Sequence, residues 1–310
     1  MFYRNLSTTI RHLLTISILT LLPVIVEAQS LSNNYSDIKP GSILFFNRFT
    51  SNPVNQLLGD TQVNITNLNQ SRAIELHFYL IDGSSCSVAD FGSSLNASQT
   101  MSFLMSDFDP GIFGYMIVVA EDESGLPTQH NWLTGTAQVR EFDGRQGILS
   151  AISIGKLTAG PITADPDGQY RLKFNGASYE KLPQVLAVPS FDSQVTTTSF
   201  LYIYSPSSNI YTGDTNSITL STLLYNDASQ SLSGSFTITC YRQDSFMTVF
   251  NRGGGINNRV PAGRTGWIRM ASSSAPILGS VITRNSLFQG GYNLPAVSLY
   301  GSYEILVPNF

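Results

Sequence analysis

The chain has 310 residues, of which 12% are charged and 42% are hydrophobic, and its formal net charge is −4. This length allows two ordinary domains with cores of their own, and the 11% of aromatic residues argue against a disordered chain. The acidic balance argues against nucleic acid as a partner.

The first residues have the pattern of a secretory signal peptide. Arg4 and Arg11 give the start of the chain a positive charge, and an apolar run of about 14 residues follows at Leu13–Val26. We predict that residues 1–28 are a signal peptide cut after Ala28. The run is too short to span a bilayer, and no later segment has 18 consecutive apolar residues. We therefore expect a secreted or cell-surface protein, or a periplasmic one, without a transmembrane segment in the mature chain.

After this segment, short apolar or alternating stretches are separated by turns. Ile43–Phe49 (ILFFNRF) begins with an apolar run that is too short for a helix, so it is expected to be a strand. Asp82-Gly83 ends another strand, which is rich in aromatic and branched residues. The spacing of apolar residues in Gly147–Leu157 also allows a helix. Strands are expected at residues 43–49, 62–67, 74–81, 131–141, 170–174, 199–205, 217–224, 233–241 and 303–307, and on both sides of the turn at 106–111.

The chain contains an internal similarity. Residues 100–120 align without a gap to residues 265–285, and this alignment equates Gly114 with Gly279. Each copy has a strand, then a turn with proline, and then a second strand that begins near glycine. We predict that one β-rich unit is used twice.

These observations predict an all-β protein of two tandem Ig-like β-sandwich domains, related by the repeat and preceded by the signal peptide. The first domain is expected at residues 29–189 and the second at 190–310. Neither has the Cys–Trp–Cys core of antibody domains.

The segments ILFFNRFTS, LIDGSSCSVADF and SDFDPGIFGYMIVVA, with the later LLYND, PAGRTGW and GGYNL, carry a resemblance. The mature chain resembles secreted two-domain β-sandwich proteins of acidobacterial type, a family that brings no activity with it. Relatives often have a second cysteine shortly after the position of Cys86, where this chain has Phe91-Gly92-Ser93-Ser94.

The two cysteines, Cys86 and Cys240, come at matching places in the two units as the sequence aligns them. Equivalent positions of repeated domains usually lie in separate loops, so we expect that the two are not bonded to each other within a chain. A bond between them would close a long loop and add roughly 4–5 kcal/mol on the chain-entropy model.

Catalytic patterns are weak. After signal removal the histidines are His77 and His130, neither beside a nucleophile motif, and we expect a protein that is not an enzyme. Scattered histidine and cysteine residues suit zinc poorly. Loop carboxylates make calcium the possible cofactor, although Asp-Gly turns and solvated loops explain the same residues. The calcium candidates are Asp107, Asp109, Glu121, Asp122 and Glu123.

The charge is divided unevenly. Residues 29–190 hold 9 Lys and Arg against 15 Asp and Glu, whereas residues 191–310 hold 6 Arg, no Lys and 5 acids. Arg pairs carboxylates bidentately, so the basic second unit of one molecule could contact the acidic first unit of the next, unless the arginines are simply scattered. The candidate binding residues are Arg252, Arg259, Arg264 and Tyr292.

We therefore predict a non-enzymatic structural or adhesive protein that binds other copies of itself or other surface proteins. The alternative is a carbohydrate-binding module or a glycan-processing accessory protein, in which tyrosine rings of the second unit would stack on sugars. Aromatic residues in strands also serve as core or cross-strand pairs, and this explanation stays open.

Overall fold

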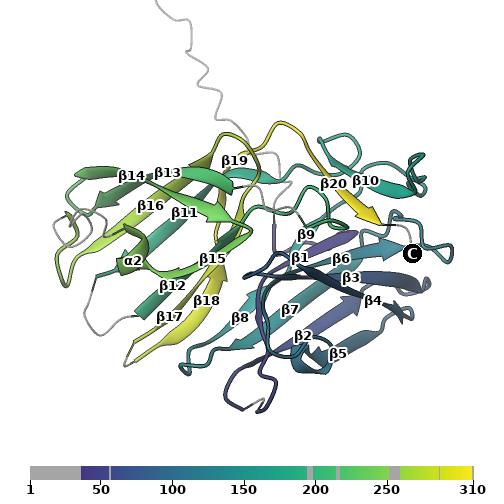
Figure 1. The fold of residues 1–310 in the computed structure, drawn as a ribbon, viewed down its shortest axis with the longest axis horizontal. Coiled ribbons are helices and arrows are strands. Elements are labelled where there is room, and N and C mark those ends of the chain that lie inside the picture. Colours follow the sequence, from purple (N-terminus) through teal and green to yellow (C-terminus); the bar gives the residue numbers. More distant parts are fainter. Residues whose placement is uncertain are drawn as a thin grey trace, which may run out of the picture. The chain divides into compact units, whose positions relative to one another are not determined.

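The computed structural model describes residues 36–55, 57–193, 198–213, 217–250, 259–285 and 287–308, which fold almost entirely into antiparallel sheets (Figure 1). The predicted signal peptide lies outside these residues. The elements are β1 (Ile43–Thr50), β2 (Asp60–Asn67), β3 (Ile74–Asp82), β4 (Val88–Leu95), β5 (Thr100–Leu104), η1 (Met105–Asp107), β6 (Phe113–Glu121), β7 (Leu133–Arg140), β8 (Gln146–Ser150), β9 (Ile152–Ile154), β10 (Gln169–Phe174), β11 (Pro183–Asp192), β12 (Thr198–Tyr204), β13 (Ser217–Asn226), β14 (Ser231–Thr239), β15 (Tyr241–Ser245), α2 (Phe246–Phe250), β16 (Thr265–Ser272), β17 (Leu278–Arg284), β18 (Gln289–Asn293), β19 (Ala296–Leu299) and β20 (Tyr303–Pro308). None of the helices in the described ranges is long and apolar enough to cross a membrane.

Two sets of nine strands have the same topology. Strands β1–β9 form the sheets β4-β3-β6-β1-β9 and β5-β2-β7-β8, and strands β11–β19 form β14-β13-β16-β11-β19 and β15-β12-β17-β18. Each order in the second set is the first with ten added to every label. One apolar cluster fills the space between the two sheets of each set, which confirms the predicted all-β sandwich fold.

The register of this correspondence differs from the one that the sequence alignment gives. The alignment equates 100–120 with 265–285, which are β5–β6 and β16–β17, whereas the sheets place β6 where β16 lies. Gly114 pairs with β1 just after a register shift, and Gly266 pairs with β11 after a shift at the same place. Gly266, and not Gly279, is therefore the counterpart of Gly114.

Gly279 has a different counterpart. The backbone carbonyl of Gly135 in β7 accepts a hydrogen bond from Ala151 N at 2.8 Å, and that of Gly279 in β17 accepts one from Leu294 N at 2.9 Å. The alignment was wrong by one strand because every strand–turn–strand segment alternates with the same period, so hydrophobic pattern alone cannot tell successive pairs apart.

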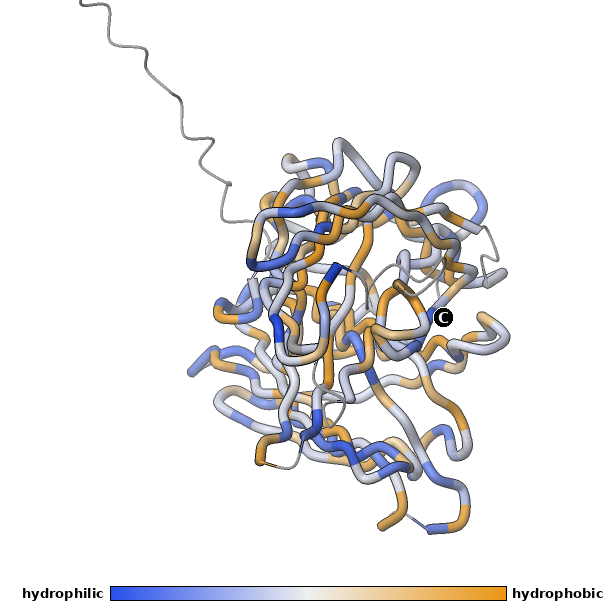
Figure 2. The backbone as a smooth tube through the Cα atoms, turned by 90° about the vertical axis from the view of Figure 1, so that its left-hand side faces the viewer, coloured by the Kyte–Doolittle hydropathy of each residue, from blue (hydrophilic) through white to orange (hydrophobic). Residues whose placement is uncertain are grey.

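Strand β1 is buried on both faces, which explains why its first four residues, Ile43–Phe46, are all apolar and do not alternate with polar residues. Phe46 points into the sandwich, where its ring lies against Gly135. Phe45 points the other way, and its ring centroid lies 6.1 Å from that of Phe174 in β10. The β10–β20 pair thus covers the outer face of this sheet, and Figure 2 shows apolar segments in the interior strands.

Two local expectations have clear outcomes. The segment 147–157 is not a helix but forms β8 and β9, because its apolar residues Leu149 and Ile152 enter the core of a sandwich. The predicted last strand, 303–307, is confirmed as β20.

The predicted boundary at 189/190 falls inside β11, which begins at Pro183 and pairs with β16 and β19. The division into two domains stays a prediction.

The expectation for the cysteines was wrong. Cys86 and Cys240 form a disulfide, with Cα atoms 5.7 Å apart, between residues separated by 154 positions. Cys86 follows β3 and Cys240 follows β14, so the structural register does not make them equivalent. Both have a left-handed backbone, with φ of 62° and 63°, which costs roughly 1–2 kcal/mol for a residue other than glycine. The bond therefore joins the two strand sets through two tight turns.

The second link between the sets is a buried ion pair beside aromatic rings. Arg48 Nε and Nη2 donate to the two carboxylate oxygens of Glu141 at 2.8 and 2.7 Å. The guanidinium lies 4.7 Å from the ring centroid of Tyr202 in β12. Both charged residues are at most 3% exposed. Burial alone would raise the pKa of Glu141, but the charge and hydrogen bonds of Arg48 hold that pKa below its usual range.

The neighbouring Asn47 completes this junction with neutral hydrogen bonds. Its amide donates to the carbonyl of Gly279 at 3.0 Å and to Asn293 Oδ1 at 2.9 Å, and its side-chain oxygen accepts from the Tyr204 hydroxyl at 2.9 Å. The Tyr241 hydroxyl donates to the backbone carbonyl of Asn47 at 3.1 Å. All four partners belong to the second strand set, so a register shift in β1 turns two polar residues towards it.

We predict that the variant Cys86→Ser/Cys240→Ser loses about 2–5 kcal/mol of unfolding free energy, because the open chain gains entropy when unfolded. Urea titration measures the loss. Reductant should lower the stability of the wild type to the same value and leave the variant unchanged. Alkylation of two thiols in the unreduced, denatured wild type would show that no disulfide exists.

We also predict that Arg48→Met and Glu141→Gln each lower the unfolding free energy by about 3–5 kcal/mol, since each leaves a buried group without its partner. The double variant Arg48→Met/Glu141→Gln should lose less than the sum of the single losses. Because the pKa of Glu141 is lowered on folding, its contribution should be present above about 4.5 and lost as pH falls through the folded value. Additive losses would contradict a coupled pair.

Candidate functional site

The predicted calcium ligands do not converge. Asp122 Oδ1 accepts the backbone N–H groups of Ser124 and Leu126 at 2.9 and 3.1 Å, as a turn-forming aspartate does. Asp107 belongs to η1, and burial, together with the charge of Asp82, raises the pKa of Asp109. Within the described ranges no three His, Cys, Asp or Glu side chains are grouped to hold a metal ion. Calcium binding stays a prediction.

Glu121 instead faces a histidine. His77 Nδ1 lies 3.6 Å from a Glu121 oxygen, and His77 Nε2 lies 3.1 Å from Asp90. Burial lowers the pKa of His77, but the hydrogen bond and charge of Glu121, and then those of Asp90, raise it above 6.5. Both ring nitrogens thus face carboxylates. This arrangement favours a charged structural imidazolium over a general base.

His130 has the opposite environment. It is 2% exposed, and its Nε2 lies 2.8 Å from Asn67 Oδ1. Burial, assisted by the charge of Arg72, lowers the pKa of His130 to about 4. A histidine that is neutral at physiological pH and bonded to a side-chain amide holds together neighbouring turns.

We predict that the two histidines titrate on opposite sides of 6.5, as NMR of their ring protons would measure. The stability that His77 adds should be present below about 6.5 and lost as pH rises through its folded pKa. The stability that His130 retains should be present above about 6.5 and lost as pH falls towards about 4. The variants His77→Gln and His130→Gln assign the signals. Two pKa values near 6.5 would contradict these environments.

The predicted binding residues of the second unit are held by their own chain. Arg264 donates two hydrogen bonds to Asp227, at 2.5 and 2.8 Å. The Arg259 carbonyl accepts a bond from Asn226, and the Tyr292 hydroxyl lies 3.5 Å from the Ser190 carbonyl. Arg252 lies outside the described residues. The structure does not bring this set together at one site, and the predicted head-to-tail contact stays a prediction.

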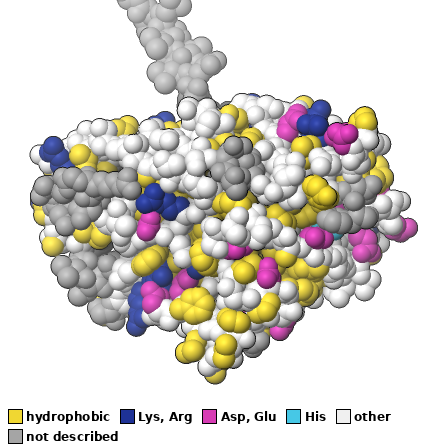
Figure 3. Space-filling view, in the orientation of Figure 1, with side chains coloured by type: hydrophobic (Ala, Val, Ile, Leu, Met, Phe, Trp, Pro, Cys, Tyr) yellow, Lys and Arg dark blue, Asp and Glu magenta, His cyan; other side chains and the backbone are white. Residues whose placement is uncertain are grey.

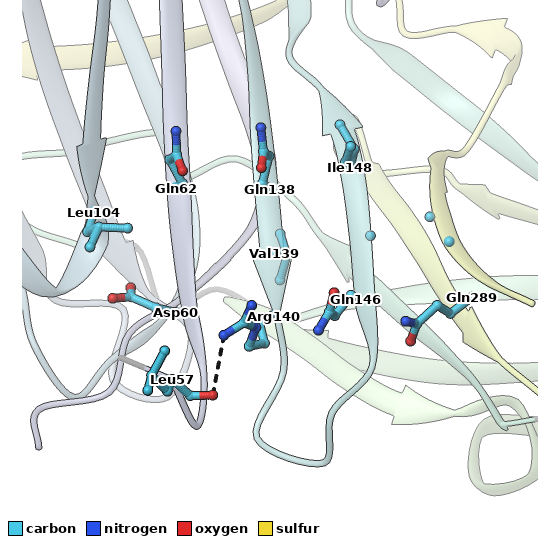
Figure 4. Close-up of a pocket in the computed structure, with 13 residues that line it drawn as sticks. Leu57, Asp60, Gln62, Leu104, Gln138, Val139, Arg140, Gln146, Ile148 and Gln289 are labelled. Atoms are coloured by element: carbon cyan, nitrogen blue, oxygen red, sulfur yellow. Dashed lines mark hydrogen bonds between the residues drawn. The ribbon is translucent and has the colours of Figure 1, made fainter. Parts of the chain in front are cut away.

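A groove that the sequence did not predict lies between the two strand sets. It has a volume of about 640 Å³, and its floor is the outer face of β2, β7 and β8, while β18 forms one side. The pairing register of these strands sets the rows of side chains across its floor (Figure 4). One row is Leu104, Gln62, Gln138 and Ile148, and the next is Asp60, Arg140 and Gln146.

Glycine allows the groove to form where two sheet edges meet. A Cβ atom on Gly147 of β8 would lie 3.1 Å from the amide nitrogen of Gly291 in β18, so a side chain there would push the strands apart. The close approach covers two strand edges that would otherwise be open. It also brings Gln289 of β18 to the side of the groove (Figure 4).

The groove presents amide groups with free hydrogen-bonding capacity. Gln138, Gln146 and Gln289 are exposed, and their side chains bond to no other residue in the part of the chain that the structure describes. Asp60 is different: it is 6% exposed and accepts the Ser106 hydroxyl at 2.6 Å. Arg140 is exposed and donates to the Leu57 carbonyl at 3.4 Å. The amides therefore face solvent, while the carboxylate is engaged.

The sequence held one signal of this surface. Residues 62–67 alternate, so that Val63 and Ile65 point inwards and the polar residues between them share the other face. Which polar faces of distant strands become neighbours depends on the sheet order. The contribution of β18 depends on the packing of the two sets.

The sequence matches no known protein family, and no curated protein matches it. Among solved structures, the chain is similar to a glycosyl hydrolase family 2 member from Bacteroides cellulosilyticus DSM 14838, with 7% identity and a TM-score of 0.17, over 91% of this chain and 30% of that one. Tripeptidyl peptidase 2 gives 10% identity and a TM-score of 0.18, over 88% and 25%. The chain thus spans less than a third of either protein. Scores this low support no functional inference, and they leave the resemblance to acidobacterial-type secreted proteins untested.

Proposed function

We propose that the protein is a non-enzymatic adhesive protein of the cell surface or extracellular space that binds carbohydrate in the glutamine-lined groove. The observation that carries this proposal is the set of exposed amides of Gln62, Gln138, Gln146 and Gln289, which line the groove together with the exposed side chain of Ile148. The disulfide supports an oxidising location.

The chemistry of the groove suits sugar hydroxyls. A primary amide offers both a donor and an acceptor, and a pair of vicinal hydroxyls can accept and donate in return. Gln62 and Gln138 are direct cross-strand neighbours. Gln62 Nε2 donates to Asn64 Oδ1 at 3.1 Å, which leaves its second N–H and its oxygen to engage a hydroxyl next to one bound by Gln138. Ile148, next in the row and 63% exposed, can cover the C–H face of a sugar ring.

The same groove supports binding better than hydrolysis. Glycoside hydrolysis uses two carboxyl groups on either side of the scissile bond. The residues that line the groove include one carboxylate, Asp60, and Ser106 and the Thr61 amide already donate to it. Surface binding of polysaccharide would let the protein adhere without altering its ligand.

We predict that a glycan array finds a bound class of oligosaccharide, and that Gln62→Ala/Gln138→Ala weakens this binding by about tenfold or more, since roughly 1.4 kcal/mol corresponds to a tenfold change. Isothermal titration measures the affinity for the best ligand. Gln243→Ala, an exposed glutamine on β15, is the matched control and should bind as the wild type does.

Equal affinity of the groove variant and the wild type would place the ligand elsewhere. An array without any bound glycan, with folded protein shown by circular dichroism, would reject carbohydrate binding.

A further inference from the structure

Large apolar side chains project from three loops that adjoin the groove. The loops are those between β1 and β2, between β7 and β8, and between β17 and β18. We call their exposed side chains the apolar rim; they are Val54 (91% exposed), Leu57 (76%), Leu58 (59%), Phe142 (57%), Leu287 (80%) and Phe288 (72%).

Direct contacts join these loops into one surface. A Cβ atom on Gly59 would lie 3.0 Å from the Phe142 ring, so the first two loops touch. Arg284, at the end of β17, donates to the Asp143 carbonyl at 2.9 Å, which ties the third loop to the second. Figure 3 shows hydrophobic side chains along the lower edge of the molecule, where these loops end.

Cationic groups adjoin the apolar rim. Arg140 and Arg284 are exposed and hydrogen-bond only to backbone carbonyls of the rim loops among the described residues. The carboxylate of Asp143 is neutralised by Arg145, whose Nε lies 2.7 Å away. Asp107 is the exposed acid at one end of the rim. The rim is thus apolar, and two arginines bonded to the same loops give it positive charge.

This arrangement fits the surface of a lipid bilayer better than a protein partner. Hot spots of protein interfaces are enriched in Tyr, Trp and Arg that fill packed pockets, whereas the six rim side chains are Val, Leu and Phe and project from three loops. Acyl chains can surround separate protrusions without a matching shape. Arg140 and Arg284, bonded to the backbone of the same loops, would then pair with the lipid phosphates.

We propose that the apolar rim docks the protein on an anionic lipid bilayer, with Leu and Phe side chains in the interfacial region and Arg140 and Arg284 at the phosphates. The proposal does not rest on carbohydrate binding, because Phe142, Leu287 and Phe288 do not line the groove.

Sedimentation of the mature protein with phosphatidylcholine vesicles, with and without phosphatidylglycerol, tests this proposal. We expect binding that is stronger with phosphatidylglycerol and weaker in high salt. The variant Phe142→Ser/Leu287→Ser/Phe288→Ser should bind at least roughly tenfold more weakly, since it removes three of the inserted groups. Arg140→Gln/Arg284→Gln should remove the preference for phosphatidylglycerol and keep the weaker binding to phosphatidylcholine.

The matched control is Trp132→Ser/Leu157→Ser/Tyr211→Ser, which removes three exposed apolar residues from other loops and should bind vesicles as the wild type does. The circular dichroism spectrum of the rim variant should match that of the wild type, which shows that the variant is folded. An unchanged glycan affinity separates this proposal from the previous one. No sedimentation of the wild type with either vesicle, or equal sedimentation of the rim variant, would overturn the proposal. A dimer in solution that the rim variant converts to a monomer would instead make the rim a contact between copies, and would also overturn it.

Discussion

The arrangement of the two strand sets depends on the polar residues that β1 buries between them. Asn47 and Arg48 are at most 2% exposed, and a charge so far from water is tolerated only with a partner. Glu141, in the loop after β7, is the partner of Arg48. The ring of Tyr202 in β12 covers the Arg48 guanidinium. An apolar contact would allow the sets to slide, whereas hydrogen bonds with defined directions fix one relative position.

The groove is a consequence of that fixed position. With the junction in place, the edge strand β8 meets the edge strand β18 through glycine, and each protects the other from pairing with a further strand. The outer face of β2 and β7 stays open beside this contact. Its amide side chains Gln62 and Gln138 are exposed because the core uses only the opposite, inward-facing residues such as Val63. The groove thus forms at no cost to either sandwich core.

The groove and the apolar rim lie side by side but have opposite chemistry, and Leu57 belongs to both. The difference follows from secondary structure. Strand positions alternate between core and solvent, so the exposed face of β2 can be entirely polar. Loop tips have no inward face, and an apolar residue placed there, such as Phe288, has no core to enter. Its exposure requires an explanation outside the fold.

The sequence by itself determined the class of fold, because short apolar runs and period-two alternation with turn residues between them permit little besides strands. It also determined the polar face of β2 and the last strand. Tertiary structure alone decided which strands are equivalent: Gly114 corresponds to Gly266, and the disulfide joins Cys86 to Cys240 across non-equivalent turns. It alone placed Gln289 of β18 in the same groove as Gln138 of β7. The physical reason is that periodicity records whether a side chain faces inwards or outwards, whereas long-range neighbours depend on the order of strands in a sheet and on packing between sheets, and neither leaves a local pattern in the chain.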